Sequence, residues 1–430
     1  KSYKTMPSMV DDPLPDPNNV RKWLSDKHLA ILDRFEMELR LGHLSTDSRT
    51  SKGMFGAADR LVVASRTVEL LKALIGTSRW KNAAQLLLLL RGLGRELHAV
   101  GGFREPAIGN VVRRVMSAVR DEAIISIGRT AGNTTNASAS TYSTATSTTT
   151  SRPSMHSMLW ANPNQKSTGI SHRRDASSSH VVEYPPDGID FPASFYIERS
   201  DFKQTIMEAI QEIVVDLEDT QKNIDDQVLS YIHADEVVLT YGKSKSIESF
   251  LKAAAVKKRS FQVVVCEGAP HMGGIEMARS LSEAGIDTIV INDSATFAIM
   301  ARVNKVLLPA HAVLANGGLI ASSGCNMVAL AASRMAVPVV CITGLFKLCP
   351  MFPHEGQNTL QDIVSPSAIL ELKELSDCLM KEVEFINPIH DYIAPELINL
   401  YVTNVGAFQP SYIYRLLAEN YHSDDWESFE

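Results

Sequence analysis

Residues 237–293 read VVLTYGKSKSIESFLKAAAVKKRSFQVVVCEGAPHMGGIEMARSLSEAGIDTIVIND, and this stretch decides the fold. Three short runs rich in Val and Ile alternate in it with two segments of helical apolar spacing, and the alternation continues to Gly344. Nearly all-apolar strands separated by such helices are typical of a parallel sheet covered on both faces. The predicted strands are VVLTY (237–241), QVVVCE (262–267), DTIVIND (287–293), KVLLPA (305–310) and VPVVCITG (337–344). Residues 234–430 therefore predict a Rossmann-like α/β domain.

The loops that follow these strands are where a binding site is expected. In an open parallel sheet, ligands bind in the crevice at the carboxyl ends of the strands. The loops are residues 242–246, 268–274, 292–296, 310–318 and 344–353. We expect any binding crevice to lie among them.

Two glycine-containing loops lack the fingerprints of nucleotide binding. Gly242-Lys243-Ser244 lies between a strand and a helix, but a phosphate-binding loop needs a second glycine where this chain has Val237. The interpretation that the start of the following helix makes a looser contact with an anion remains open. The glycines of residues 268–274 do not form GxGxxG, so the sequence predicts no dinucleotide cofactor.

Titratable residues in these loops form no catalytic or metal-binding set. Neither HExxH spacing nor a neighbouring pair of ligands is found around the histidines His271, His311, His354 and His390. Asn292-Asp293 suits either acid–base chemistry or the cap of the next helix, and we favour the cap. Cys266 and Cys341 lie within predicted strands and are expected to be small core residues. The sequence therefore predicts no metal and no cofactor.

The N-terminal part of the chain predicts helices only. Between residues 20 and 127 the apolar residues recur at three- and four-residue steps, which indicates an α-helical domain. Three helices are expected after residue 60, the third beginning at Pro106, because proline suits a first helical turn. An apolar stripe from Phe202 to Ile232 indicates a long helix within residues 194–233 that bridges this domain to the sheet domain.

Two segments are predicted to lie outside the folded domains. Residues 1–19, with a Pro-rich stretch, are expected to form a loose N-terminal tail. Residues 128–193 are rich in Ser and Thr, above all at 133–151. Such a segment has too few apolar side chains to offset its ordering entropy, so we expect a disordered insertion.

Composition excludes several classes of protein. Even the run LLLLL (86–90) falls far short of the ~20 apolar residues that a membrane helix needs. Lys and Arg total 42 against 49 Asp and Glu, so the chain has a net charge of −7 and lacks the basic surplus of nucleic-acid-binding proteins. Five cysteines without CxxC spacing indicate a reducing compartment, and we expect the cytosol.

Several long stretches together resemble one known family, the regulatory subunits of eukaryotic translation initiation factor 2B. They are residues 239–251 (LTYGKSKSIESFL), 263–300, 303–332 and 395–421. Within that family, FKLCPMFPHE (346–355) and PSYIYRLL (410–417) resemble the beta branch rather than its alpha and delta sisters. The resemblance covers nearly all of the predicted sheet domain and, more loosely, the helices from Leu61 to Glu122.

The resemblance extends in fold to methylthioribose-1-phosphate isomerase and ribose-1,5-bisphosphate isomerase. It implies that Gly242 stands where those enzymes carry a catalytic Cys, and that His311 stands where they carry a catalytic Asp. Their Asn-Lys pair matches Ala321 and Ser322, whereas an Ala-Asn-Gly turn is retained. The implied vestigial crevice comprises Gly242, His311, Asn316, Gly317, Ala321 and Ser322. Because Gly242 has no side chain to move a proton, the resemblance implies that the isomerase chemistry is lost.

The resemblance implies a non-catalytic subunit of the guanine-nucleotide exchange factor for initiation factor 2. In the family, alpha, beta and delta subunits form a regulatory core, and gamma and epsilon carry the exchange activity. The core docks initiation factor 2 through its alpha subunit and distinguishes the phosphorylated form. The implied assembly is a two-fold decamer in which this chain pairs most directly with delta through the Rossmann-like domains. No nucleic acid or membrane contact is implied.

The C-terminal segment, residues 387–417, is expected to carry the subunit contact. Its aromatic residues suit an interface core, although they could equally pack internally. The interface candidates are Tyr392, Tyr412, Tyr414 and Arg415. Residues 396–402 are read as a helix-like apolar run.

Two alternative functions stay open: an active sugar-phosphate isomerase and a small-metabolite-binding module of the same fold.

Overall fold

A computed structural model describes most of the chain, namely residues 19–41, 60–101, 105–132, 191–353, 363–369 and 383–426. Residues 126–190 form a unit apart from the compact unit built by Lys1–Ile125 and Phe191–Glu430. The predicted N-terminal tail up to residue 18 and most of the predicted insertion, residues 133–190, lie outside the described residues. The helix that precedes the insertion runs past residue 128 and ends at Gly132.

The larger unit contains a seven-stranded sheet in the order β10-β9-β7-β4-β1-β2-β3. Its strands are β1 (Glu236–Tyr241), β2 (Phe261–Cys266), β3 (Asp287–Ile291), β4 (Lys305–Pro309), β7 (Val339–Ile342), β9 (Leu400–Val402) and β10 (Ala407–Phe408). All pairs are parallel except β10 with β9. The predicted Rossmann-like fold is confirmed, and all five predicted strands are present.

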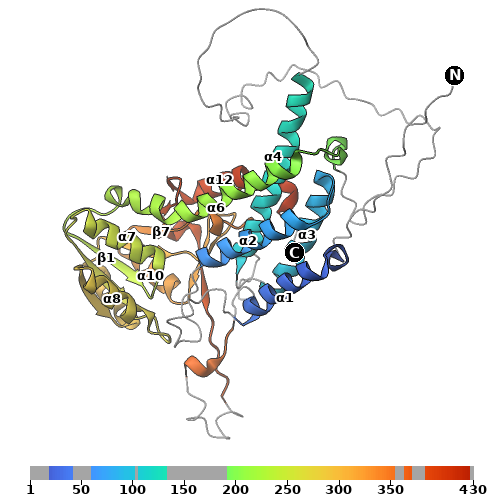
Figure 1. The fold of residues 1–430 in the computed structure, drawn as a ribbon. Coiled ribbons are helices and arrows are strands. Elements are labelled where there is room, and N and C mark those ends of the chain that lie inside the picture. Colours follow the sequence, from blue (N-terminus) through green and yellow to red (C-terminus); the bar gives the residue numbers. More distant parts are fainter. Residues whose placement is uncertain are drawn as a thin grey trace, which may run out of the picture. The chain divides into compact units, whose positions relative to one another are not determined.

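Helices cover both faces of this sheet (Figure 1), and successive buried residues of β1, β2, β4 and β7 pack alternately into two apolar clusters. On β1, Val238 packs with α7 (Lys245–Val256), α8 (Gly273–Glu283) and the end of α6 (Phe202–Asp226). Its neighbour Leu239 points to the opposite face. There it packs with α9 (Thr296–Met300), α10 (Cys325–Arg334) and α12 (Ile413–Asn420). Two apolar layers therefore enclose the strands.

Two parts of the sheet domain differ from the sequence prediction. The helix predicted for residues 396–402 is wrong, because Leu400–Val402 pairs with Val340–Ile342 and forms β9. A second, three-stranded antiparallel sheet was not predicted. It consists of β5 (Ala312–Val313), β6 (Leu319–Ser322) and β8 (His390–Ile393). Pairing with distant strands decides both conformations, and local apolar spacing does not report it.

The helical part of the unit packs on the sheet domain. It comprises α1 (Asp26–Arg40), α2 (Arg60–Thr77), α3 (Ala83–Gly101) and α4 (Pro106–Gly132). Helix α6 contacts α2 and α7, as expected of a bridging helix. Near the start of α4, Asn110 Nδ2 donates to Phe346 O at 3.0 Å. The start of this helix is thereby fixed beside the loop that follows β7.

Candidate functional site

A hollow of about 260 Å³ opens at the carboxyl ends of β1, β4 and β7, where a binding crevice was expected. Three of the five predicted loops line it, through residues 243–246, residues 309–311 and the turn after β7 that begins at Gly344. The starts of α2 and α7 and the end of α6 close its sides. The helical part of the unit therefore supplies one wall of the crevice.

Cationic side chains dominate the charge of this crevice. Arg60, Lys243, Lys245 and Lys347 line it, and among the described residues no carboxylate does. Lys347 Nζ donates to Ala310 O at 2.9 Å, which holds the ammonium group at the end of β4. Hydroxyl groups of the loop after β1 and of the first turns of α7 add hydrogen-bonding groups. This lining is suited to an anion.

Two stacked imidazoles form the floor of the crevice. The rings of His311 and His390 lie 3.9 Å apart between centroids, with 27° between their planes. Burial, with a contribution from the positive charge of Arg60, lowers the pKa of His390 to about 3. His390 is therefore neutral at physiological pH. Nearby, burial raises the pKa of Glu105, and Arg60 and Lys347 oppose that shift.

The structure brings together only part of the crevice inferred from the resemblance. His311 and Ser322 line the hollow, and Gly242 directly precedes its first loop in a left-handed conformation (φ +61°). Asn316 and Gly317 do not line it, because they form the β5–β6 turn. There Asn316 Nδ2 donates to the Tyr392 hydroxyl at 2.8 Å, and Gly317 O accepts from the Tyr401 hydroxyl at 2.8 Å.

Ala321 belongs to β6, is buried in the apolar core and does not line the hollow either. Arg60 and Lys347 were not among the predicted site residues, and His390 was considered only as a metal ligand. Lys347 lies within the quoted stretch FKLCPMFPHE, in the loop after a predicted strand, and that position was the available signal. For Arg60 the sequence contains no such signal, because this residue belongs to a helix far away in the sequence from the loops of the crevice.

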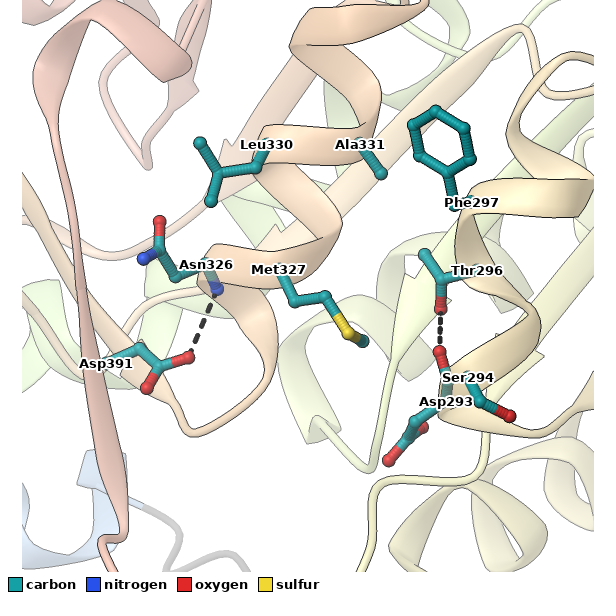
Figure 2. A pocket seen from close by; sticks show the side chains of 9 residues that line it. All are labelled: Asp293, Ser294, Thr296, Phe297, Asn326, Met327, Leu330, Ala331 and Asp391. Atoms are coloured by element: carbon teal, nitrogen blue, oxygen red, sulfur yellow. Dashed lines mark hydrogen bonds between the residues drawn. The ribbon is translucent and has the colours of Figure 1, made fainter.

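A second, more open hollow of about 500 Å³ lies between α9 and α10 (Figure 2). Phe297, Met327 and Leu330 contribute its apolar lining, with Asp293 and Asp391 at its edge.

Asp293 does not cap the following helix, so that prediction is wrong. Its carboxylate instead accepts from the backbone N–H groups of Gly268 and Ala269 and from the Tyr241 hydroxyl. It therefore ties the loop after β3 to the loop after β2.

The four interface candidates lie in different environments. Tyr392 is half-buried against Asn316, and Tyr412 packs against the core with its ring stacked on Phe408 at 5.2 Å. Tyr414 is about half exposed. Arg415 is exposed and pairs with Glu419, one helical turn away, at 3.0 Å.

The described cysteines are buried, as was expected for Cys266 and Cys341. Burial raises the pKa of Cys266 to about 11 and that of Cys341 to about 12. Neither thiol is therefore a nucleophile at neutral pH. Within the part of the chain that the structure describes, no three His, Cys, Asp or Glu side chains gather closely enough to hold a metal ion.

Comparison with known proteins decides the family. The sequence profile of the Initiation factor 2 subunit family matches residues 56–410. The chain belongs to this family. A relative from Dictyostelium discoideum, "Translation initiation factor eIF2B subunit beta", is 38% identical over 366 residues, which is 84% of this chain and 91% of the relative. The protein of the same name from Schizosaccharomyces pombe is 34% identical over 365 residues, which is 84% of this chain and 92% of that relative. The resemblance to initiation factor 2B subunits, and to the beta branch, is confirmed.

Solved structures of the Initiation factor 2 subunit family share the fold. The crystal structure of eIF2B beta from Chaetomium thermophilum matches with a TM-score of 0.61 and 24% identity, over 96% of this chain and 98% of that chain. A chain of the tetrameric eIF2B-beta2-delta2 complex from C. thermophilum matches with a TM-score of 0.59 and 23% identity, over 94% and 98% of the two chains. No helix among the described residues is long and apolar enough to cross a membrane.

Proposed function

We propose that this chain is a non-catalytic regulatory subunit of the guanine-nucleotide exchange factor for translation initiation factor 2, and that it pairs directly with a delta-type sister. The observation that carries the proposal is the 38% identity, over 84% of the chain, to a protein named as the beta subunit of this factor. The solved complex of beta and delta chains from C. thermophilum supports the choice of partner. Alpha, gamma and epsilon subunits complete the cytosolic two-fold decamer of this proposal.

The chemistry of the crevice supports a non-catalytic role. An aldose–ketose shift needs a positioned acid or base to move a proton. Gly242 has no side chain, and the His311 ring is buried against His390. On this proposal the scaffold of the sugar-phosphate isomerases is retained without their reacting groups. The purified chain should therefore not interconvert methylthioribose-1-phosphate or ribose-1,5-bisphosphate.

In the proposed complex this chain helps to dock the alpha subunit of initiation factor 2 and to distinguish its phosphorylated form. Reconstitution with the four sister subunits tests this role. With the chain present, nucleotide release from initiation factor 2 should be accelerated and should be inhibited by the phosphorylated factor. Omitting the chain should remove the inhibition and lower the yield of assembled complex. Full inhibition without the chain, or isomerase turnover that is lost in a His311→Ala variant, would contradict the proposal.

A second candidate function is the binding of a phosphorylated metabolite, and the carboxylate-free cationic lining of the crevice favours it. Titration calorimetry with ribose-1,5-bisphosphate tests it directly. Lys245→Gln should weaken binding about tenfold, since a charge-assisted hydrogen bond contributes about 1.5 kcal/mol. Lys222→Gln, on the exposed side of α6, is the matched control. No heat of binding with the unaltered protein would exclude this function.

A further inference from the structure

A stacked pair of histidine rings faces the cationic crevice. His311 is 5% exposed and His390 7%, and both line the hollow at the carboxyl ends of β1, β4 and β7. Strand β6 holds both residues in place. His311 N donates to Ile320 O at 2.8 Å, and His390 lies opposite Ser322 in the pairing of β6 with β8. We call His311 and His390 the histidine pair.

Positive charge prevails around the histidine pair. The charged groups that line the hollow or act on its lining are Arg60 at the start of α2, Lys243 and Lys245 around the start of α7, Lys347 after β7 and, before α4, Glu105. Glu105 Oε2 lies 3.9 Å from Arg60 Nε, and Lys243 is paired with Glu276 at 2.6 Å. Four cations therefore face the crevice with two carboxylates beside them, so the surroundings remain positive.

Two further carboxylates near the crevice are turned away from the histidine pair. Asp391 follows His390 on β8, and successive residues of a strand point to opposite faces. Its carboxylate accepts from backbone N–H groups at the start of α10. Asp225, near the end of α6, accepts from Ser249 Oγ at 2.5 Å and from Gln221 Nε2 at 2.7 Å. Since those two side chains line the hollow and Asp225 does not, Asp225 lies behind the polar lining.

These surroundings favour a neutral histidine pair until an anion binds. Burial first, and the charge of Arg60 second, lower the pKa of His390 to about 3. A doubly charged oxyanion beside Arg60 and Lys245 would offset their positive charge and stabilise an imidazolium ring. Only one of the two rings can gain a proton, because two positive charges on rings 3.9 Å apart repel each other strongly.

We propose that the crevice takes up the phosphate group of its ligand together with one proton from solvent, and that the histidine pair holds this proton. The inference rests on the second candidate function, the binding of a phosphorylated metabolite, and adds a dependence on pH to it. Affinity should rise as the pH falls, since binding consumes a proton. By the resemblance, His311 stands where the isomerases carry a catalytic Asp, so this proton uptake belongs to the present chain rather than to those enzymes.

Calorimetric titration of the full chain with sulfate tests the proton uptake. Sulfate remains a dianion near neutral pH, so a change of affinity with pH comes from the protein. The affinity should rise at least about threefold from pH 7.5 to pH 6.0, which corresponds to the uptake of about a third of a proton or more. Titration in two buffers with different heats of ionisation counts the proton directly, because the buffer supplies it.

Substitutions identify the group that takes up the proton. The double variant His311→Gln/His390→Gln should bind sulfate with the same affinity at both pH values. Glu105→Gln should keep the pH dependence, because Glu105 does not line the hollow. The matched control His271→Gln, at an exposed histidine in the loop after β2, should keep it too. In the unaltered protein, sulfate should shift a histidine ring signal in the NMR spectrum toward its protonated position, a result that requires no variant to fold.

Each contrary outcome has its own meaning. If sulfate binds with an affinity independent of pH and no proton is taken up, the inference fails, although metabolite binding stands. If proton uptake persists in the double variant or vanishes in Glu105→Gln, another group holds the proton, and the inference fails too. If sulfate, inorganic phosphate and ribose-1,5-bisphosphate all fail to bind, the second candidate function fails with it, whereas the role as a regulatory subunit does not depend on either. If inorganic phosphate binds as tightly as the bisphosphate, the ligand is the free ion, and the metabolite function fails while the proton uptake stands.

Discussion

At the scale of single residues, Tyr412 has the sequence features of an interface anchor and the surroundings of a core residue. Its ring stacks on Phe408 with 7° between the planes and packs against the buried cluster beneath the sheet. The guanidinium of Arg415 lies over the same ring, 5.2 Å from its centroid. The sequence reports that both residues occur in an aromatic segment, but it does not report which of them packs inward.

The two residues should therefore respond differently to truncation. Tyr412→Ala should lower the free energy of unfolding by about 2 kcal/mol, because it removes a half-buried ring from a packed cluster. Arg415→Ala should leave the melting temperature unchanged. Urea denaturation and delta binding, measured on the same preparations, distinguish packing from docking. A Tyr412→Ala variant with unchanged stability and weakened delta binding would make Tyr412 an interface residue.

His390 should make stability depend on pH in the acidic range. Burial first, and the charge of Arg60 second, lower its pKa in the folded protein to about 3, whereas an unfolded histidine titrates near 6.5. Below pH 6.5 the unfolded chain takes up a proton that the folded chain does not, so acid favours unfolding. The contribution should approach about 1.4 kcal/mol per pH unit between pH 5.5 and 4.

The histidine contribution can be isolated by substitution. His390→Gln should flatten the plot of unfolding free energy against pH in that range, measured by urea denaturation at each pH. The exposed His233→Gln is the control. Equal slopes for His390→Gln and the unaltered protein would show that His390 does not titrate between the two states.

At the scale of helices and strands, the sequence predicted what local patterns encode. Five apolar runs between helical patterns were enough to predict strands β1, β2, β3, β4 and β7 and a sheet covered on both faces. Strand β9 and the β5-β6-β8 sheet were missed, because short strands are stabilised by partners far away in the sequence. The same limit applies to the crevice. Its loops after β1, β4 and β7 were predicted, whereas Arg60 comes from a helix that only tertiary packing brings there.

A buried ion pair joins the C-terminal end of the chain to α4. The Arg120 guanidinium donates to both carboxylate oxygens of Asp425, at 2.8 and 2.7 Å, and Asp425 is fully buried. Arg113 donates to the carbonyl groups of Asp425 and Trp426, each at 3.1 Å. These contacts hold the end of the sheet domain against the helical part of the unit.

Breaking this pair should be costly. Asp425→Asn leaves the Arg120 charge buried without a counter-ion, and the loss expected for such a change is about 3–5 kcal/mol of unfolding free energy. The neighbouring Asp424→Asn is the matched control, since Asp424 is exposed and lies 3.6 Å from the same guanidinium. Thermal and urea unfolding of both variants measures the difference. Similar stability of the two variants would mean that the pair does not hold the C-terminal end.

At the scale of the whole molecule, the helices and the sheet form one compact unit, and residues 126–190 are separate from it. The crevice, the hollow between α9 and α10 and the Arg120–Asp425 pair all belong to the larger unit. Function and stability are therefore expected to depend on Lys1–Ile125 and Phe191–Glu430 together. Neither the helical part nor the sheet part is expected to be fully stable alone, since α6 and the C-terminal end pack on both.

Deletion of residues 133–180 tests this division of the chain. The segment is rich in Ser and Thr and contributes few apolar side chains, so its removal should not open a core. Shortening the connection between two ends of a chain reduces the entropy lost when they come together, by about 0.6 kcal/mol for each halving of its length. The variant should therefore melt at the same temperature as the full chain or slightly above it, and its affinity for delta should be unchanged. Calorimetry and the delta-binding assay measure both. If the variant melts normally but no longer assembles with its sister subunits, the deleted segment takes part in the assembly and folds on a partner.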